Sequence, residues 1–373
     1  MTANLRKQIF ENAKILVVKI GTNVLSLDNG LLDRDRIRKL AAEVVQLRED
    51  GYDVVIVSSG AIGAGMAELG MEKRPTALPE LQAAAAVGQG KLIATYDDCF
   101  KEKGYHAGQI LITREDVDDR QRYLNGRNTI LSLLSLGAIP VINENDTISI
   151  DEITFSDNDI LSALVASLVK ADVLIMLSPA PGLCRQGKVI DVVEKIDQNV
   201  KRLVSGATSE RGVGGMDSKL EAASTACRAG ISTIIAPGKE ERVLTRIAGG
   251  EAVGTLFLAG EDKLAGRKGW IGMAVQPKGV IRVDAGAARA VLERGKSLLA
   301  SGIVGVGGDF EKGDAVSIAA GEAEIARGLT NYSSADVRQI MGLRSSQIAK
   351  KLGSKPYDEV VHRNNMVLHK TSD

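Results

Sequence analysis

Two clusters of short polar side chains stand close together in the sequence. The first, Asn143 to Asp146, follows the apolar pair Val141–Ile142, and the pair Asn158–Asp159 comes twelve residues after Asp146. We interpret them as a strand end with its carboxylate loop and as the start of a helix. Carboxylates accept hydrogen bonds, and amides both donate and accept them. Because ligands bind beyond the carboxyl ends of strands in open parallel sheets, the pattern predicts a binding site here.

Two lysines occupy similar positions in other parts of the chain. Lys19 ends an apolar run and is followed by Gly21-Thr22-Asn23, and Lys219 lies one turn inside a predicted helix after the glycine loop 212–218. Backbone amides in small-residue turns approach anions closely, and an ammonium group neutralises them. A lysine at a strand end is more often simply solvated. Together with the acidic pair, however, these lysines predict phosphoryl transfer without a Walker motif.

A third candidate is Ser58-Ser59-Gly60-Ala61, which closes another strand and starts a helix. Its hydroxyl and amide groups suit a carboxylate or phosphate, although an ordinary serine N-cap explains it equally well. The frame is not Gly-x-Ser-x-Gly, and no histidine stands in an esterase order, which argues against a serine hydrolase. The chain also lacks Gly-x-x-x-x-Gly-Lys-Ser/Thr, and Gly63 to Glu68 fails the dinucleotide-binding pattern.

Alternating strands and helices must position these groups. Short β-branched runs alternate with longer helical patterns, which is typical of an α/β domain with a mainly parallel sheet. The expected strands are 14–19, 52–57, 106–111, 139–142, 172–177 and 231–236, and the expected helices are 33–50, 81–103, 127–136, 157–170 and 218–229.

The sequence pattern changes after Trp270, where glycine residues separate short apolar runs. This pattern is typical of a small β-rich domain, and 373 residues exceed the size of most single cores. We therefore expect a catalytic domain at residues 1–260, a linker at 261–276 and a second domain at 277–373.

Composition excludes several classes of protein. Lysine plus arginine equals aspartate plus glutamate at 47 each, so no large field of one sign favours nucleic acid or anionic membranes. The three cysteines and three histidines show no zinc spacing, and we expect no metal-ligating residues. The first residues are polar, and no apolar run approaches the ~20 residues of a membrane helix. We expect a soluble, cytoplasmic protein.

Several segments, read together, resemble the glutamate 5-kinase family in its longer form, in which a C-terminal PUA domain follows an amino-acid-kinase domain. The resemblance covers about Lys14 to Leu368. The segments that carry it are VVKIGTNVL around Lys19, VSSGAIGAG around Ser59, LITRED ending at Asp116, PVINENDT ending at Thr147, FSDND ending at Asp159, GVGGMDSK ending at Lys219, and KGVIRVDAGAARAVLERGKSLL and ARGLTNYSS in the second domain.

This resemblance implies a three-layer α/β sandwich that phosphorylates the γ-carboxylate of L-glutamate with ATP and Mg²⁺, the first step of proline biosynthesis. It implies that Lys19 and Lys219 hold the phosphates and stabilise the transferring group, and that Asp159 orients both ammonium groups. The implied glutamate-binding residues are Ser59, Asp146 and Asn158. The implied ATP-binding residues are Lys19, Ser178, Pro179, Val213, Gly214, Gly215, Met216, Asp217, Ser218 and Lys219.

The chain departs from the family pattern near the expected nucleotide site. Ser178-Pro179 stands where the family usually has Thr-Asp, and Cys184 stands where an aromatic residue is common. Proline removes a backbone donor and the carboxylate is absent, so we expect these changes to affect nucleotide affinity more than catalysis. The resemblance also implies a homo-oligomer that proline inhibits by competing near the glutamate site.

Two alternative readings remain. PUA domains occur in RNA-modifying enzymes, which suggests an RNA-associated protein, but the second domain lacks a strong basic face with interleaved aromatic residues. A degenerate kinase acting as a metabolite sensor would explain Ser178-Pro179, although the presence of Lys19, Asp159 and Lys219 argues against it.

Overall fold

The computed structural model describes residues 2–27, 29–148, 158–204, 215–260, 277–353 and 357–368. The chain forms two compact units, Met1–Lys263 and Leu264–Asp373. The predicted linker, 261–276, lies outside the described residues, so the structure does not test the predicted boundaries of the two domains. Within the described ranges, no helix combines the length and the apolar character that crossing a membrane requires.

The first unit is built on an eight-stranded sheet with the order β3-β4-β2-β1-β5-β9-β10-β8, in which only β10 runs antiparallel to its neighbour β9. This confirms the predicted α/β class and its mainly parallel sheet. The strands are β1 (Ile15–Ile20), β2 (Asp53–Ser58), β3 (Ala107–Ile112), β4 (Ile139–Glu144), β5 (Val173–Ser178), β8 (Val192–Val193), β9 (Ser232–Pro237) and β10 (Thr255–Phe257), with a separate hairpin of β6 (Cys184–Arg185) and β7 (Lys188–Val189).

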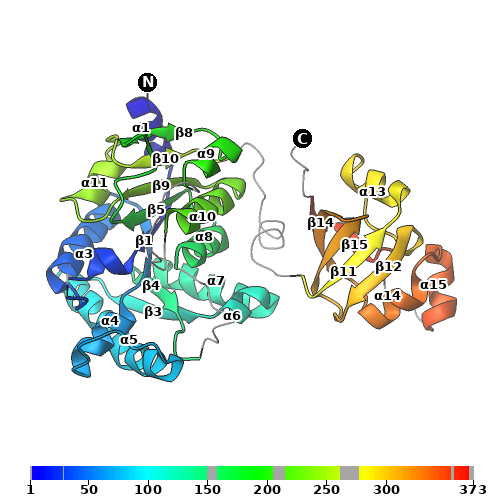
Figure 1. Ribbon diagram of the computed structural model, residues 1–373, viewed down its shortest axis with the longest axis horizontal. Helices are drawn as coiled ribbons and strands as arrows, with labels where there is room; N and C mark the ends of the chain where they lie inside the picture. Colours follow the sequence, from blue (N-terminus) through cyan, green and yellow to red (C-terminus); the bar gives the residue numbers. More distant parts are fainter. Residues whose placement is uncertain are drawn as a thin grey trace. The chain divides into compact units, whose positions relative to one another are not determined.

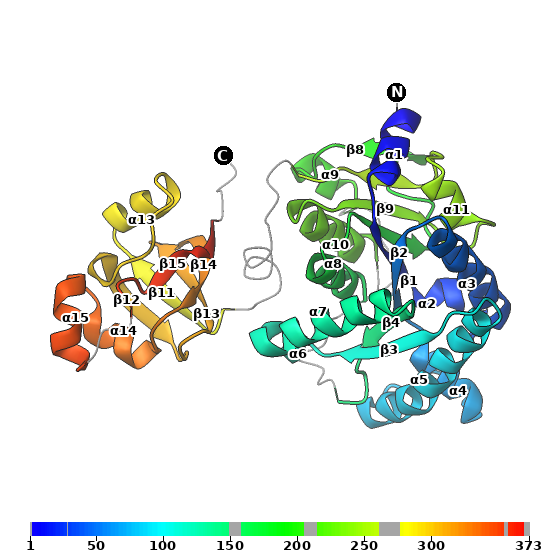
Figure 2. The same cartoon turned by 180° about the vertical axis from the view of Figure 1, so that it is seen from behind.

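Helices cover both faces of this sheet (Figures 1 and 2). On one side lie α3 and α11, while α7, α8 and α10 lie on the other. The helices of the first unit are α1 (Thr2–Glu11), α2 (Thr22–Leu25), α3 (Arg34–Glu49), α4 (Ala61–Glu68), α5 (Leu78–Lys101), α6 (Arg114–Asp118), α7 (Arg120–Ser135), α8 (Asn158–Val169), α9 (Gln198–Arg202), α10 (Met216–Arg228) and α11 (Val243–Ala248).

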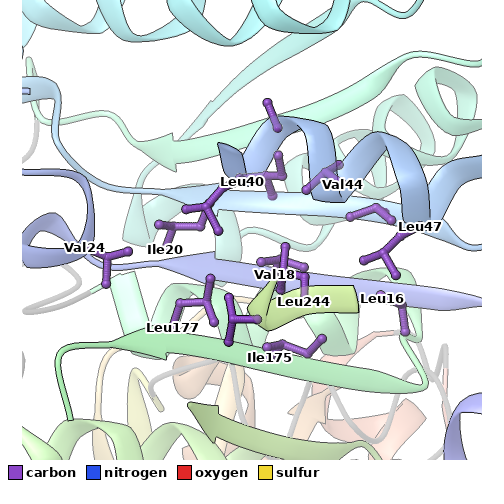
Figure 3. Packing of buried hydrophobic residues seen from close by; sticks show 14 of the residues in the cluster. Leu16, Val18, Ile20, Val24, Leu40, Val44, Leu47, Ile175, Leu177 and Leu244 are labelled. Carbon is purple, nitrogen blue, oxygen red and sulfur yellow. The ribbon is translucent and has the colours of Figure 1, made fainter. Parts of the chain in front are cut away.

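The pleat of β1 decides which way Lys19 points. Leu16, Val18 and Ile20 belong to the core cluster that also contains Leu40 and Val44 of α3, and Figure 3 shows these side chains meeting. Because successive side chains of a strand point to opposite faces, Lys19 lies on the other face, which α8 and α10 cover. The apolar alternation of the strand therefore places the ammonium group of Lys19 on the side of the sheet that carries these two helices.

The second unit contains a five-stranded sheet with the order β12-β11-β13-β14-β15. Only β11 and β13 pair in parallel, and this confirms the predicted small β-rich domain. Its elements are β11 (Gly279–Val283), α13 (Ala285–Leu292), a 3-10 turn (Ala300–Gly302), β12 (Ile303–Gly308), β13 (Ala315–Ala320), β14 (Ala323–Thr330), α14 (Ser334–Ile340), α15 (Ser345–Leu352) and β15 (Val361–Leu368).

Local sequence explains where several helices begin. The Thr113–Asp116 part of the LITRED segment is a capping box at the start of α6, in which each side chain accepts a bond from the other residue's backbone N–H. The helix predicted at 127–136 begins earlier, at Arg120, where Asp119 caps it by accepting a bond from Arg122 N. Because the first turns of α7 are largely polar, apolar periodicity did not reveal that the helix begins at Arg120. Asp157, predicted as the first residue of α8, lies outside the described residues.

Candidate active site

The centre of the candidate site is Asp159, in the first turn of α8, which is completely buried. Its two carboxylate oxygens accept bonds from different ammonium groups. Lys19 Nζ, from the end of β1, donates to Oδ1, and Lys219 Nζ, from α10, donates to Oδ2 at 3.0 Å. Both lysines are nearly buried, at 3% and 6% exposure. The three side chains together carry two positive charges and one negative charge, a sum that attracts an anion.

The beginning of α10 adds a hydroxyl to this cluster. Ser218 Oγ donates to Asp159 Oδ2 at 3.0 Å and is also within 2.9 Å of Gly215 O. Gly215 is the N-cap of α10 and makes no side-chain capping bond, while Met216 and Asp217 open its first turn. The first backbone N–H groups of a helix and its dipole favour negative charge. This end of α10 therefore suits phosphate groups. Val213 and Gly214 lie outside the described residues.

Asn158, the residue before Asp159, belongs to a second group of polar side chains. Asn158 Nδ2 donates to Ser59 Oγ at 2.8 Å, to Ser58 O at 3.1 Å and to Asn143 Oδ1 at 2.9 Å. The ends of β2 and β4 are thus joined to the start of α8. Within the described ranges, Asn158 Oδ1 is buried and has no hydrogen-bond partner. A buried acceptor without a partner costs about 1–3 kcal/mol, and a ligand N–H would satisfy it.

Asp146 follows β4 and is half-buried. Burial raises the pKa of its carboxyl to about 6, and the positive charge of Arg74 opposes this shift. An ammonium group held against this carboxylate would favour its ionised form. The sequence prediction placed Ser59, Asp146 and Asn158 in one substrate site. The structure brings Ser59 and Asn158 into contact and places Asp146 two residues beyond the strand that carries Asn143.

The predicted nucleotide loop begins where β5 ends. Ser178 is 2% exposed, and its Oγ accepts a bond from Ala180 N at 3.0 Å. Pro179 between them is exposed. Since β5 pairs with β1 up to Ile20 and Leu177, this loop emerges from the same edge of the sheet as Lys19. Cys184 follows in the short strand β6.

Three contributors to the site were not assigned an individual role from the sequence. Asn143 belongs to the first polar cluster of the sequence, and its position at a strand end was the available signal. Gln89 and Tyr96 lie on α5, where Asn143 Nδ2 donates to Gln89 Oε1 at 2.9 Å and the hydroxyls of Tyr96 and Ser58 are 3.1 Å apart. Their only sequence signal was a polar group in a largely apolar helix.

Comparison with known proteins identifies the family of this chain. The model of the amino acid kinase family matches residues 14–237, and the PUA domain model matches residues 279–352. The chain therefore belongs to the amino acid kinase family.

Particular relatives match almost the whole length of the chain. Glutamate 5-kinase from Thermoanaerobacter sp. (strain X514) is 45% identical over 361 residues, covering 95% of this chain and 97% of that protein. Glutamate 5-kinase from Syntrophus aciditrophicus (strain SB) is 45% identical over 375 residues, covering 98% and 97%. Among solved structures, carbamate kinase from Giardia lamblia bound to AMP-PNP aligns with 67% of this chain and 99% of its own, at 18% identity and a TM-score of 0.49.

Proposed function

We propose that this protein transfers the γ-phosphoryl group of ATP to the side-chain carboxylate of L-glutamate and forms γ-glutamyl phosphate, the first step of proline biosynthesis. The observation that carries the proposal is the buried Lys19–Asp159–Lys219 cluster beside Asn158. It offers two ammonium groups for phosphates directly next to a polar site for a small amino acid. The 45% identity to glutamate 5-kinases over nearly the whole chain supports the same activity.

The chemistry needs positioning and charge screening rather than a general base. The γ-carboxylate of glutamate is already ionised at neutral pH, because its pKa is about 4.3. One of its oxygens attacks the γ-phosphorus of ATP while the bond to the β,γ-bridging oxygen breaks, and that electron pair leaves with ADP. The enzyme must therefore bring two anions together and stabilise charge on the transferring group.

Lys19 and Lys219 are the groups proposed to do this. Their ammonium groups would contact the phosphates, and Lys219 would strengthen its contact as charge develops in the transition state. Asp159 would hold both ammonium groups in place, since each of its oxygens accepts from one lysine. Ser218 and the N-terminal N–H groups of α10 would complete the phosphate site.

Glutamate would be recognised by its α-amino-acid end. Its α-ammonium group fits Asp146 and the unsatisfied Asn158 Oδ1, both of which are acceptors. The Ser59 hydroxyl, which already accepts from Asn158 Nδ2, can donate its own proton to a carboxylate. This arrangement distinguishes a free amino acid from a substrate whose amine is acylated.

The nucleotide is proposed to bind along the edge formed by the ends of β1 and β5 and the start of α10. Ser178, Pro179 and residues 213–219 would contact it. ATP carries Mg²⁺ on its phosphates, where the ion keeps oxygen ligands and screens negative charge. In the part of the chain that the structure describes, no three histidine, cysteine, aspartate or glutamate side chains form a metal cluster. We propose that Mg²⁺ enters as part of the MgATP substrate.

Further properties follow the family resemblance and are proposed with the activity. These are inhibition by proline competing near the glutamate site, a homo-oligomeric state, a cytoplasmic location, and domains at 1–260 and 277–373 joined by 261–276. The alternative to the kinase function is an RNA-associated protein whose second domain binds RNA.

The test is ATP consumption by the full chain with Mg²⁺ and L-glutamate, in the presence of hydroxylamine to trap an acyl phosphate as hydroxamate. Aspartate, N-acetylglutamate and the absence of an acceptor are the controls. We expect hydroxamate to form only with L-glutamate. Equal hydroxamate formation with N-acetylglutamate would contradict the proposed ammonium site, and no turnover with any acceptor would reject the kinase activity.

A further inference from the structure

Gln89 is a buried polar residue on a helix that does not itself carry any of the proposed substrate-binding groups. It lies on α5 and is 7% exposed. The preceding residue, Gly88, allows α5 to pack against the backbone of α4, because a Cβ at this position would lie 1.8 Å from Ala61 O. Figure 1 shows the two helices side by side. This close packing sets how far Gln89 reaches toward the sheet.

The side-chain amide of Gln89 forms a hydrogen bond with the side-chain amide of Asn143. Asn143 Nδ2 donates to Gln89 Oε1 at 2.9 Å, and Asn143 Oδ1 accepts from the backbone N–H of Glu144 at 2.9 Å. A backbone N–H can only donate, so the atom of Asn143 that faces it must be the oxygen. The amide nitrogen of Asn143 must then face Gln89, and Gln89 must present its oxygen.

The same reasoning fixes the next amide. Asn158 Nδ2 donates to Asn143 Oδ1 at 2.9 Å and to the Ser58 carbonyl oxygen at 3.1 Å. Both of these atoms are acceptors, so the nitrogen of Asn158 faces them and its oxygen faces away. That oxygen is the buried acceptor for which the described residues supply no partner. A chain of three amides therefore runs from α5 to the proposed ammonium site.

We propose that Gln89 is a positioning residue that makes the site selective for an α-ammonium group, by fixing the Asn143 amide and through it the outward-facing oxygen of Asn158. Without an acceptor at position 89, the buried nitrogen of Asn143 loses its partner. The Asn143 amide is then held only through its oxygen, by Glu144 N and Asn158 Nδ2, and it shifts to bring its unpaired nitrogen to another acceptor or to water, which weakens its bond to Asn158. Asn158 would lose part of the restraint on its own orientation. The inference rests on the proposed glutamate kinase activity.

The test compares two variants of the full chain. Gln89→Met keeps the length of the side chain but removes the acceptor, while Gln89→Glu keeps an acceptor oxygen. Gln46→Met, at an exposed position on α3, is the matched control. The measured quantities are the KM values for L-glutamate and ATP, kcat, and the competitive inhibition constant of glutarate, the same dicarboxylate without the ammonium group.

We expect Gln89→Met to raise the KM for L-glutamate by about 5- to 160-fold, the range for a lost buried hydrogen-bond partner. The glutarate constant, the KM for ATP and kcat should change by less than about twofold, since none of them depends on the Asn158 oxygen in this scheme. Gln89→Glu should restore most of the selectivity for L-glutamate. Gln46→Met should behave like the unchanged protein.

A double-mutant cycle with Asn158→Ala provides a second readout, with L-glutamate binding measured by calorimetry. Because Gln89 acts through Asn158, Gln89→Met should weaken binding much less in the Asn158→Ala background. Additive effects, or equal weakening of glutamate and glutarate, would overturn the inference. If Gln89→Met does not fold, Gln89→Glu decides: retained selectivity supports the inference, and lost selectivity overturns it. Absence of glutamate-dependent hydroxamate with the unchanged protein would instead reject the proposed function itself.

Discussion

Asp159 and Lys219 meet in a buried ion pair, with Lys219 Nζ 3.0 Å from Asp159 Oδ2. They come from the first turns of α8 and α10, two helices that pack against each other on one face of the sheet. The other oxygen of Asp159 is occupied by Lys19 from β1. One carboxylate therefore fixes two ammonium groups that the chain separates by two hundred residues, from position 19 to position 219.

The first prediction concerns Lys219 as a group that acts in the transition state. Lys219→Ala should lower kcat by about 10²–10³-fold, the range for removing one electrostatic stabiliser, with little change in the KM for glutamate. Steady-state kinetics with both substrates measures this, and Lys39→Ala, at an exposed lysine, is the control. A rise in the KM for glutamate alone would assign Lys219 to substrate binding instead.

The second prediction concerns the pH dependence of glutamate binding. Burial raises the pKa of the Asp146 carboxyl to about 6, and only its ionised form pairs with an ammonium group. As the pH falls from about 7.5 to 5.5, protonation should raise the KM for glutamate by about fourfold, because a carboxyl with a pKa of about 6 is about three-quarters protonated at pH 5.5. Kinetics between about pH 7.5 and 5.5 avoid titration of glutamate itself, whose side-chain pKa is about 4.3.

Asp146→Asn is the matched variant for this measurement. Its KM for glutamate should be high and nearly independent of pH, because the titrating group is gone, while the KM for ATP stays at the value of the unchanged protein. If the variant kept the same pH profile as the unchanged protein, another group would be responsible for it.

The third prediction concerns the loop after β5. Pro179 has no backbone N–H, so Pro179→Ala restores a donor at the proposed nucleotide site. One additional hydrogen bond contributes about 0.5–1.5 kcal/mol, which corresponds to a KM for ATP about 2- to 12-fold lower. The KM for glutamate should not change. An unaltered KM for ATP would show that position 179 does not limit nucleotide affinity.

The fourth prediction concerns the packing of α4 against α5. Gly88→Ala places a methyl group 1.8 Å from Ala61 O and 2.3 Å from Gly65 N, so it should reduce the free energy of unfolding by about 1–3 kcal/mol or more. Gly90→Ala on the same helix meets nothing within 4 Å and should increase it by about 0.5–1 kcal/mol. Denaturant unfolding of both variants checks the contrast, and similar values would contradict the packing argument.

Apolar periodicity in the sequence determined the class of the fold. β1, β5 and β9 consist of β-branched and other apolar residues with few interruptions, as expected for strands buried on both faces. The same local patterns predicted the five longest helices of the first unit, α3, α5, α7, α8 and α10, and the β-rich second unit. The positions of Lys19 and Asp159 at element ends followed from these boundaries. Such features depend only on neighbouring residues, which is why sequence alone reveals them.

Other features depend on contacts between distant parts of the chain. The polar N-terminal segment showed no sign that Arg6 would be buried at 1% exposure and bonded to the carbonyls of Asp191, Val253 and Gly254. Nor did periodicity indicate that Gln89 would meet Asn143, or which way the Asn158 oxygen would point. Hydrogen bonds across the sheet decide these orientations, and a linear pattern does not contain their geometry. The sequence by itself therefore determined the elements and the polar ends of the strands, whereas the tertiary structure decided which amides join and which acceptor faces the substrate.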